Sequence, residues 1–593
     1  MKLARSKPHP AVAGVDTVER APRHAVDHDI HAEGRRLGEL VVASNLAGEA
    51  DVAAALDEAR RSDRMLGRVL VEKRVLTESQ LVDILSEQCG LPIADFRIIS
   101  PSAGAIALVT EATARTMAFL PLSIEDDGVI QVAVADPTDA ALDRVRQTIG
   151  HPIQALLAEP ADLMRAIGSS YRATSRIDSQ VQAFETRDAL RKDAARYETI
   201  AVNDEAPVVQ VVQLIITQGL RDRASDIHIE PSDDRIRVRY RIDGALHDVL
   251  SLPGSIGPAV VSRIKIMAEL NIVEKRRPQD GQISLRIEDR EVDIRVSTTA
   301  VVGGERVVMR LLDKSRPLFE LAQLGMPDDV ATKYESLLRS PYGMVICAGP
   351  TGGGKTTTLY ASLGELNSPD RNIMTIEDPV EYTFDTINQI QIHEQAGITF
   401  ANGLRSILRQ DPDIILVGEV RDVETARIAV QSALTGHFVL SSLHATDSIS
   451  ALYRLIDMGI ERFLVASSIT AVVAQRLVRR TCTYCREPYK PSPEELAFMN
   501  EFSGVTPAGG FTHGAGCNFC SHTGFLDRIG VYELMAVTDE VRELILERGS
   551  HDELRKLCQS QGMSTLLEES LRLVGDGVTT LAEVMRTIYV AGA

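Results

Sequence analysis

A glycine-rich segment, G-P-T-G-G-G-K-T-T at residues 349–357, has the residue types that hold the phosphates of a nucleotide. The apolar run before it, Met344 to Ala348, predicts a buried strand, and a helix is expected to begin near Lys355. Glycines lack a Cβ, so the backbone N–H groups can curl round a triphosphate, and the helix N-terminus adds a partial positive charge. We therefore expect Lys355 to reach the β- and γ-phosphates and Thr356 to ligate Mg²⁺. The expected nucleotide-binding residues are Gly349, Pro350, Thr351, Gly352, Gly353, Gly354, Lys355, Thr356 and Thr357.

Carboxylates end two further apolar runs downstream of this segment. One run is I-M-T-I-E-D-P-V-E at residues 373–381, and the other is D-P-D-I-I-L-V-G-E at residues 411–419. Charged groups at the tip of a buried strand are costly unless they face a metal ion or water, and ligands of parallel sheets bind at that edge. The alternative is that they cap the next helix. Their position after a phosphate loop favours a role with Mg²⁺ or water for Glu377, Asp378, Glu381 and Glu419.

Two histidines, His437 and His444, flank a third apolar run. A single histidine in such a place is usually structural. Because both lie beside the expected nucleotide edge, the pair indicates a role in sensing the γ-phosphate.

Four of the seven cysteines form two C-x-x-C pairs, at residues 482–485 and 517–520. Four thiolates suit tetrahedral Zn²⁺, and a reducing cytoplasm favours metal over disulfides. The intervening loop, residues 486–516, is longer than the usual ribbon spacing. We expect a structural zinc site made by Cys482, Cys485, Cys517 and Cys520, and buried thiols at Cys89, Cys347 and Cys558.

The elements that position these residues are spread over several domains, as 593 residues require. The net charge of −19 and the 4% aromatic content argue against a general nucleic-acid binder. No run of about 18 apolar residues predicts a membrane-spanning helix. Residues 1–23 have no apolar core typical of a signal peptide, so a cytoplasmic protein is expected.

Ahead of the nucleotide segment lie a repeat and two smaller units. Residues 36–42 and 65–71 begin two copies of a helical pattern offset by 29 residues, which predicts a small bundle. Residues 91–172 suggest a small α/β unit. The strictly alternating strand Ile236–Ile242 places Arg237, Arg239 and Arg241 on one face. That row is either a solvated edge or a set of cations offered to a neighbouring subunit's phosphates. Residues 340–475 alternate strands with helices, which predicts a parallel sheet covered on both faces.

Together these motifs resemble the ATPases of type II secretion and type IV pilus assembly. The segments G-P-T-G-G-G-K-T-T, I-E-D-P-V-E, L-V-G-E-V-R-D and T-G-H-F-V-L-S-S-L-H match that family's Walker A, Asp, Walker B and His boxes. The resemblance implies a homohexameric ring that hydrolyses ATP with Mg²⁺. In it Glu419 activates water, Glu377 and Glu381 support Mg²⁺ or water, and Lys355 is a further catalytic residue. The resemblance also implies that arginines of the preceding domain complete the active site, with Arg241 in R-I-D-G carried over first.

The N-terminal repeat resembles the cyclic di-GMP-binding domain of such motors. In that domain each copy begins with Arg-Leu-Gly and ends with Gln, but here Ala59 replaces the first Gln and Met65 the second Arg. A docking domain without the nucleotide is the alternative, since half of the polar set is missing. The residues that match the motif are Arg36, Leu37, Gly38, Leu66, Gly67 and Gln88.

The resemblance completes the expected organisation, an α/β multidomain protein. The expected parts are, in order, a disordered tail (1–30), a docking or regulatory domain (31–172), a linker (173–203), a PAS-like domain (204–325) and a RecA-like ATPase domain (326–593), which contains the zinc insertion (482–520).

The expected function is a motor on the inner face of the cytoplasmic membrane that drives pilus or pseudopilus assembly. It would act through an inner-membrane platform protein and a membrane-anchored docking subunit, with the zinc insertion pinning a hairpin that touches a membrane partner. A DNA-translocating conjugation ring is one alternative, which the acidic balance disfavours. A nucleotide-responsive scaffold is another, which the intact Lys355, Thr356 and Glu419 disfavour.

Overall fold

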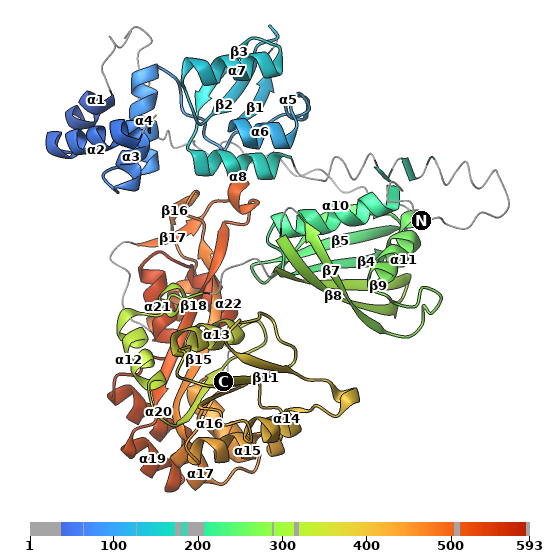
Figure 1. Ribbon diagram of the computed structural model, residues 1–593, viewed down its shortest axis with the longest axis vertical. Coiled ribbons are helices and arrows are strands. Elements are labelled where there is room, and N and C mark those ends of the chain that lie inside the picture. The colour runs from blue at the N-terminus through green and yellow to red at the C-terminus, as the bar shows by residue number, and fades with distance from the viewer. Residues whose placement is uncertain are drawn as a thin grey trace, which may run out of the picture. The chain divides into compact units, whose positions relative to one another are not determined.

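The computed structural model describes residues 37–588, apart from residues 63, 126, 172–179, 182, 185, 187–206, 288–289, 314–318 and 503–509. The chain forms two compact units (Figure 1). Residues up to 95 together with 101–164 form the first, and residues 96–100 together with 165–593 form the second. The predicted tail, Arg36 and most of the predicted linker lie outside the described residues.

The tandem repeat at the start of the first unit folds into four helices. They are α1 (Leu37–Ala43), α2 (Glu49–Ser62), α3 (Leu66–Glu72) and α4 (Glu78–Cys89), which keep the 29-residue offset. Leu40, Val52 and Leu70 lie in one shared core, so the two copies bury each other as expected. Cys89 was predicted to be buried but is exposed, because it is the last residue of α4.

A small three-stranded sheet follows the repeat. Its strand order is β1-β2-β3, with β1 antiparallel to β2 and β2 parallel to β3 across the helix α7. The elements are α5 (Ala103–Ile106), α6 (Glu111–Met117), β1 (Phe119–Ile124), β2 (Ile130–Val134), α7 (Asp139–Ile149), β3 (Ile153–Leu157) and α8 (Pro160–Ser170).

The second unit begins with an antiparallel six-stranded sheet in the order β6-β5-β4-β9-β8-β7. Along β5, Ile236, Val238 and Tyr240 are buried in a core with the helices α10 and α11, and the arginines between them are more exposed. The elements are α10 (Pro207–Arg221), β4 (Asp226–Ser232), β5 (Arg235–Ile242), β6 (Ala245–Pro253), α11 (Gly257–Met267), β7 (Gln279–Ile287), β8 (Arg290–Val301) and β9 (Gly304–Asp313).

The remainder of the second unit is built on a seven-stranded sheet in the order β12-β11-β13-β14-β10-β15-β18. Its strands are β10 (Gly343–Ala348), β11 (Ile373–Glu377), β12 (Asn388–Gln391), β13 (Ile414–Val417), β14 (Phe438–Leu443), β15 (Ile469–Thr481) and β18 (Phe525–Ala536). Its helices are α12 (Asp328–Leu338), α13 (Lys355–Leu366), α14 (Phe400–Ile407), α15 (Val423–Leu434), α16 (Ser448–Asp457), α17 (Arg462–Ser468), α19 (Asp539–Leu546), α20 (His551–Ser560), α21 (Leu566–Gly575) and α22 (Leu581–Thr587). Between β15 and β18 the chain forms β16 (Arg486–Tyr489), α18 (Pro493–Phe502) and β17 (Phe511–Gly514).

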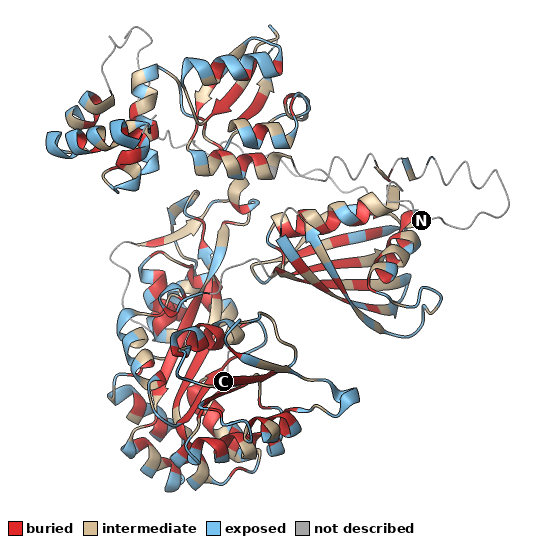
Figure 2. Cartoon of the chain, viewed as in Figure 1, coloured by how far each residue is buried: buried red, intermediate tan, exposed pale blue. Residues whose placement is uncertain are grey.

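The strand β10 lies inside this sheet, and all of its residues are buried. Figure 2 shows the strands of this sheet coloured largely as buried. Met344 and Ile346 belong to the core shared with α14, α15 and α16, whereas Val345 and Cys347 belong to the core shared with α12 and α13. This burial explains the continuous apolar run, because a strand covered on both faces shows no polar alternation.

Six neighbouring strands are parallel, as the alternation of strands and helices predicted. The edge strand β18 differs, since it pairs with β15 in the antiparallel sense. The two long strands enclose residues 482–524, so the chain leaves along β15 and returns along β18.

The C-terminal helix α22 is tied to β15 by a buried carboxylate. Glu583 is fully buried and accepts hydrogen bonds from Arg479 and Arg586. Burial opposes its ionisation, but the hydrogen bonds from Arg586 and Arg479 hold the pKa of Glu583 below its usual value.

Glu583→Gln should destabilise the chain by about 2 to 3 kcal/mol, since it leaves two arginines without their buried carboxylate. The folded-state pKa is depressed, so the stabilisation is present above the ordinary pKa and lost as the pH falls through the folded-state value. The penalty measured by thermal unfolding should therefore shrink in acid. Glu424→Gln, which breaks the exposed pair with Arg405, is the control and should cost under about 1 kcal/mol. Equal losses in the two variants would contradict this assignment.

Candidate functional site

The predicted phosphate segment joins the end of β10 to the start of α13. Gly352 and Gly354 have φ of +75° and +87°, so the turn needs the left-handed conformation that glycine adopts without strain. Gly354 is the N-cap of α13, and the first N–H groups of this helix face the loop. The segment therefore has the curled backbone that phosphate binding requires.

Lys355 folds back over this loop. Its Nζ donates to the carbonyl oxygens of Gly349 and Pro350, each at 3.0 Å. Burial lowers the pKa of Lys355, while the carboxylate of Glu419 opposes that shift. The ammonium group is thus held at the loop by these two carbonyl oxygens.

Glu419 follows β13 and faces the neighbouring strand's last residues. Its Oε2 lies 3.5 Å from Nε2 of His444, which follows β14, and its Oε1 accepts a hydrogen bond from Arg421. The hydroxyl of Ser442 on β14 donates to the carbonyl oxygen of Gly418 at 2.8 Å. This bond holds in place the segment that joins the end of β13 to Glu419. The structure therefore brings Glu419 and His444 together at one edge of the sheet.

Arg421 is a site residue that motif reasoning missed. Its guanidinium joins Glu419 to Asp378, with an Nη1–Oδ2 distance of 3.2 Å to the latter. Its place two residues after Glu419, in E-V-R-D, was the available signal.

The predicted carboxylate Glu377 has a different setting. It is buried at the end of β11 and accepts hydrogen bonds from Tyr360, from Thr375 at 2.5 Å and from Gln389 at 3.2 Å. Tyr360 lies on α13, so Glu377 links the helix that follows the phosphate loop to the neighbouring strand. Burial raises the pKa of Glu381, and the nearby Arg295 and Arg310 oppose that shift.

His437 lies at the other end of β14 from His444. Its backbone carbonyl accepts from Gly343 at the beginning of β10, whereas the phosphate loop begins at the end of that strand. The six extended residues of β14 lie between the two histidines, which are therefore roughly 20 Å apart. His437 is therefore not at the edge of the sheet where the phosphate loop of this chain lies, and its ring is hydrogen-bonded to the carbonyl oxygen of Ser432 at 3.1 Å.

Arg241, the arginine carried over from the family, lies on the antiparallel sheet. It donates to the carbonyl oxygen of Gly244 at 2.9 Å and lies 3.5 Å from Asp226. Arg295 and Arg310, on β8 and β9, are the arginines whose charge acts on Glu381.

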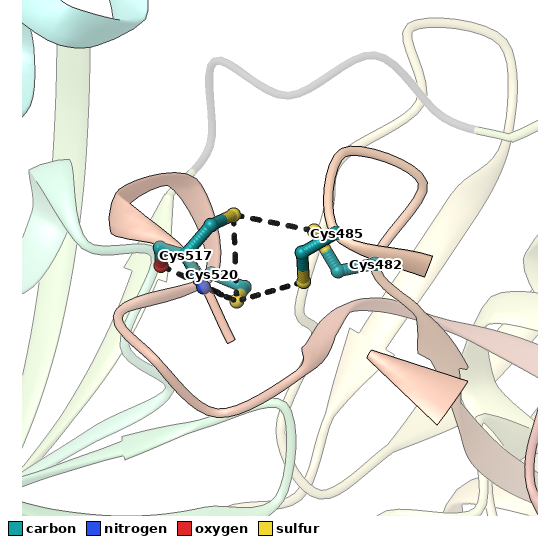
Figure 3. A group of neighbouring side chains, drawn as sticks. All are labelled: Cys482, Cys485, Cys517 and Cys520. Carbon is teal, nitrogen blue, oxygen red and sulfur yellow. Dashed lines mark hydrogen bonds between the residues drawn. The ribbon is translucent and has the colours of Figure 1, made fainter. Parts of the chain in front are cut away.

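The four paired cysteines converge at one point (Figure 3). Their Sγ atoms lie within 4.8 Å of one another, with 3.9 Å between Cys482 and Cys517 and 3.8 Å between Cys517 and Cys520. Zn–S bonds of about 2.3 Å in a tetrahedron place sulfurs about 3.8 Å apart. The Cys520 Sγ also accepts from the backbone N–H of Cys517 and Gly524, as a thiolate would. The cluster fits a zinc ion.

In the repeat, the matching glycines have a packing role. A Cβ on Gly38 would lie 3.0 Å from Val52, and one on Gly67 would lie 2.8 Å from Leu81. Ala59, at the position of a family Gln, is buried in the repeat core. Leu37, Leu66 and Gln88 are described, whereas Arg36 is not.

No helix within the described ranges is long and apolar enough to cross a membrane.

The comparisons with known proteins cover nearly the whole chain. The family described as "Type II/IV secretion system protein" matches residues 201–586, and the MshEN domain matches residues 89–177. The type IV pilus assembly ATPase PilB of Myxococcus xanthus is 40% identical over 559 residues, which cover 93% of this chain and 98% of that protein. The type II secretion system protein HxcR of Pseudomonas aeruginosa is 46% identical over 429 residues, covering 72% of this chain and 87% of that protein.

Among solved structures, the ATPase DotB of Legionella pneumophila covers 65% of this chain and 96% of its own at 21% identity, with a TM-score of 0.47. The family match alone spans more than half of the residues. This chain belongs to the family of type II/IV secretion system proteins.

Proposed function

We propose that this chain hydrolyses ATP to drive assembly of a type IV pilus or of a type II secretion pseudopilus. The observation that carries the proposal is the gathering of Lys355, Glu419 and His444 beside a glycine loop, at the carboxyl edge of adjacent parallel strands. Relatives named for both machines match over most of their length, which supports a motor of this kind without choosing between the two.

In the proposed reaction, Lys355 leaves its carbonyl partners and binds the β- and γ-phosphates. Hydroxyl and carboxylate oxygens suit Mg²⁺, and Thr356 and Asp378 would hold it, so that it neutralises charge on the phosphates. Glu419 orients the attacking water, while Arg421 and His444 hold the Glu419 carboxylate in place. Catalysis is positioning and charge stabilisation, with no covalent intermediate.

Glu377 has a positioning role in this proposal. Its three hydrogen bonds join β11 and β12 to Tyr360 on α13, the helix that begins at Lys355. It supports the Mg²⁺ and water site by fixing that helix.

We further propose a homohexamer in which arginines of the antiparallel sheet complete a nucleotide site. The candidates are Arg241 and Arg310, which both lie beside Asp226 on this sheet, and Arg295 on β8.

The cysteine cluster would hold structural zinc and fix the β16–β17 hairpin next to it. We propose that this module contacts an inner-membrane platform protein from the cytoplasmic side, with no part for nucleic acid.

We assign the N-terminal repeat to docking on a membrane-anchored subunit rather than to cyclic di-GMP. The buried Ala59 and the exposed Met65 occupy positions where the nucleotide-binding motif has Gln and Arg.

Glu419→Gln should bind ATP as the unchanged chain does but hydrolyse it about 100-fold more slowly or worse, because the water loses its base. Lys355→Ala should lose both binding and turnover. Phosphate release and nucleotide binding measure the two effects, and Glu424→Gln on the exposed face of α15 is the control. Near-normal turnover in either variant would contradict the site assignment.

The purified chain should contain about one zinc per chain, since four thiolates fill one tetrahedral shell. Elemental analysis of Cys482→Ser should show the metal lost, while Cys89→Ser should keep it. Full metal content in Cys482→Ser, or none in the unchanged chain, would refute the zinc assignment.

Calorimetry of the full chain with cyclic di-GMP should show no binding at high micromolar ligand, because two polar groups of the motif are absent. Tight binding that Arg36→Ala abolishes would overturn the docking assignment and make this nucleotide a regulator of the motor.

A further inference from the structure

Two consecutive residues of β15, Gln475 and Arg476, contact two different segments of the candidate site. Gln475 contacts the phosphate loop, and Arg476 contacts the segment that follows β14. Neither residue belongs to the motifs described above. β15 pairs with β10 in parallel, with Ala474 opposite Ala348, so Gln475 extends one residue beyond the end of β10. It therefore lies beside the phosphate loop.

Gln475 is completely buried, and both polar atoms of its side-chain amide are hydrogen-bonded. Its Nε2 donates to the carbonyl oxygen of Gly353 at 2.7 Å, and its Oε1 accepts from the thiol of Cys347 at 3.0 Å. Burial raises the pKa of Cys347 to about 12, so this thiol keeps the proton that it donates. The amide thus clamps the loop to the strand that precedes it.

The close approach of Gln475 also explains two loop glycines. A Cβ on Gly349 would lie 2.7 Å from the carbonyl oxygen of Gln475, and one on Gly354 would lie 3.0 Å from its Nε2. A side chain at either position would therefore crowd Gln475, which is a reason for glycine there in addition to phosphate binding.

Arg476 binds the loop that carries His444. Successive side chains of a strand point to opposite sides, so Arg476 leaves β15 away from Gln475. Its Nη2 donates to the carbonyl oxygen of Thr446 at 2.7 Å, two residues after His444, and its Nη1 donates to the carbonyl oxygen of Gln475 at 3.1 Å. Burial lowers the pKa of Arg476, and Asp447 and Glu533 oppose the shift.

We propose that Gln475 and Arg476 are positioning residues with separate tasks, Gln475 for nucleotide binding and Arg476 for the chemical step. Gln475 shapes the phosphate loop. Arg476 fixes the segment after β14, and through His444 it fixes Glu419. The proposal rests on the proposed ATPase function.

Because the two residues have separate tasks, substituting them should change different kinetic constants. Gln475→Glu keeps the shape but puts an acceptor against the Gly353 carbonyl, so the Kd and KM for ATP should rise at least about tenfold with kcat little changed. Arg476→Lys keeps the charge but loses the two-point hold, so kcat should fall about tenfold while KM stays within about twofold.

The experiment measures steady-state ATP hydrolysis and equilibrium binding of Mg–ADP by the full-length variants, with thermal unfolding to check folding. Matched controls are Gln431→Glu on α15 and Arg480→Lys, an exposed residue of β15, and both should behave as the unchanged chain. If Gln475→Glu unfolds at a lower temperature than the unchanged chain, the binding measurement is made on Gln475→Asn instead. This variant keeps the amide group and should also bind Mg–ADP more weakly.

Parallel changes of kcat and KM in both variants, or no change in either, would overturn the proposal. An unchanged chain that binds Mg–ADP but does not hydrolyse ATP would refute the proposed function instead. In that case weaker ADP binding by Gln475→Glu would still support the loop-shaping task, and unaltered ADP binding would overturn it.

Discussion

The parallel alignment of β10 with β14 and β15 is the constraint on which the rest of this protein depends. Parallel strands end at the same edge of a sheet, so the loops that follow them meet there although they are far apart in sequence. β10 delivers the phosphate loop, β13 and β14 deliver Glu419 and His444, and β15 delivers the residues that brace them. Alternate residues of β10 pack into two different cores, so a one-residue shift of register would move every side chain into the wrong core and disrupt the packing on both faces.

The acidic groups at this edge differ because their surroundings differ. Glu377 is buried and its oxygens are occupied by neutral donors, which suits a residue that holds two elements together. Glu419 is paired with a histidine and an arginine near the phosphate loop, which suits a residue that handles water. Two carboxylates that end neighbouring strands in similar motifs can therefore have separate roles.

Local patterns in the sequence were enough to predict the phosphate loop, the tandem helical repeat and the convergence of four cysteines. Each depends on spacing within a short segment. The contacts of Gln475 with Gly353, of Arg476 with Thr446 and of Arg421 with Asp378 could not be predicted, because each partner lies on a segment far away in the sequence that only the strand order brings close. The position of His437 has the same origin, since adjacency to an apolar strand does not say which end of the strand faces the loop. The chain leaves the sheet at the end of β15 and comes back along β18, so these two strands pair in the antiparallel sense. The periodicity of the sequence does not reveal that the chain comes back to the same sheet.

The proposed mechanism requires Lys355 to exchange the carbonyl oxygens of its own loop for the phosphates of ATP. The structure of the full chain with Mg²⁺ and a slowly hydrolysed ATP analogue, determined by cryo-electron microscopy, tests it most directly. In that structure, Nζ of Lys355 should have left Gly349 and Pro350 to contact the β- and γ-phosphates, and Glu419 should lie within hydrogen-bond reach of a water beside the γ-phosphate. Nucleotide bound elsewhere, or a Lys355 that stays on its carbonyl partners beside bound nucleotide, would contradict it.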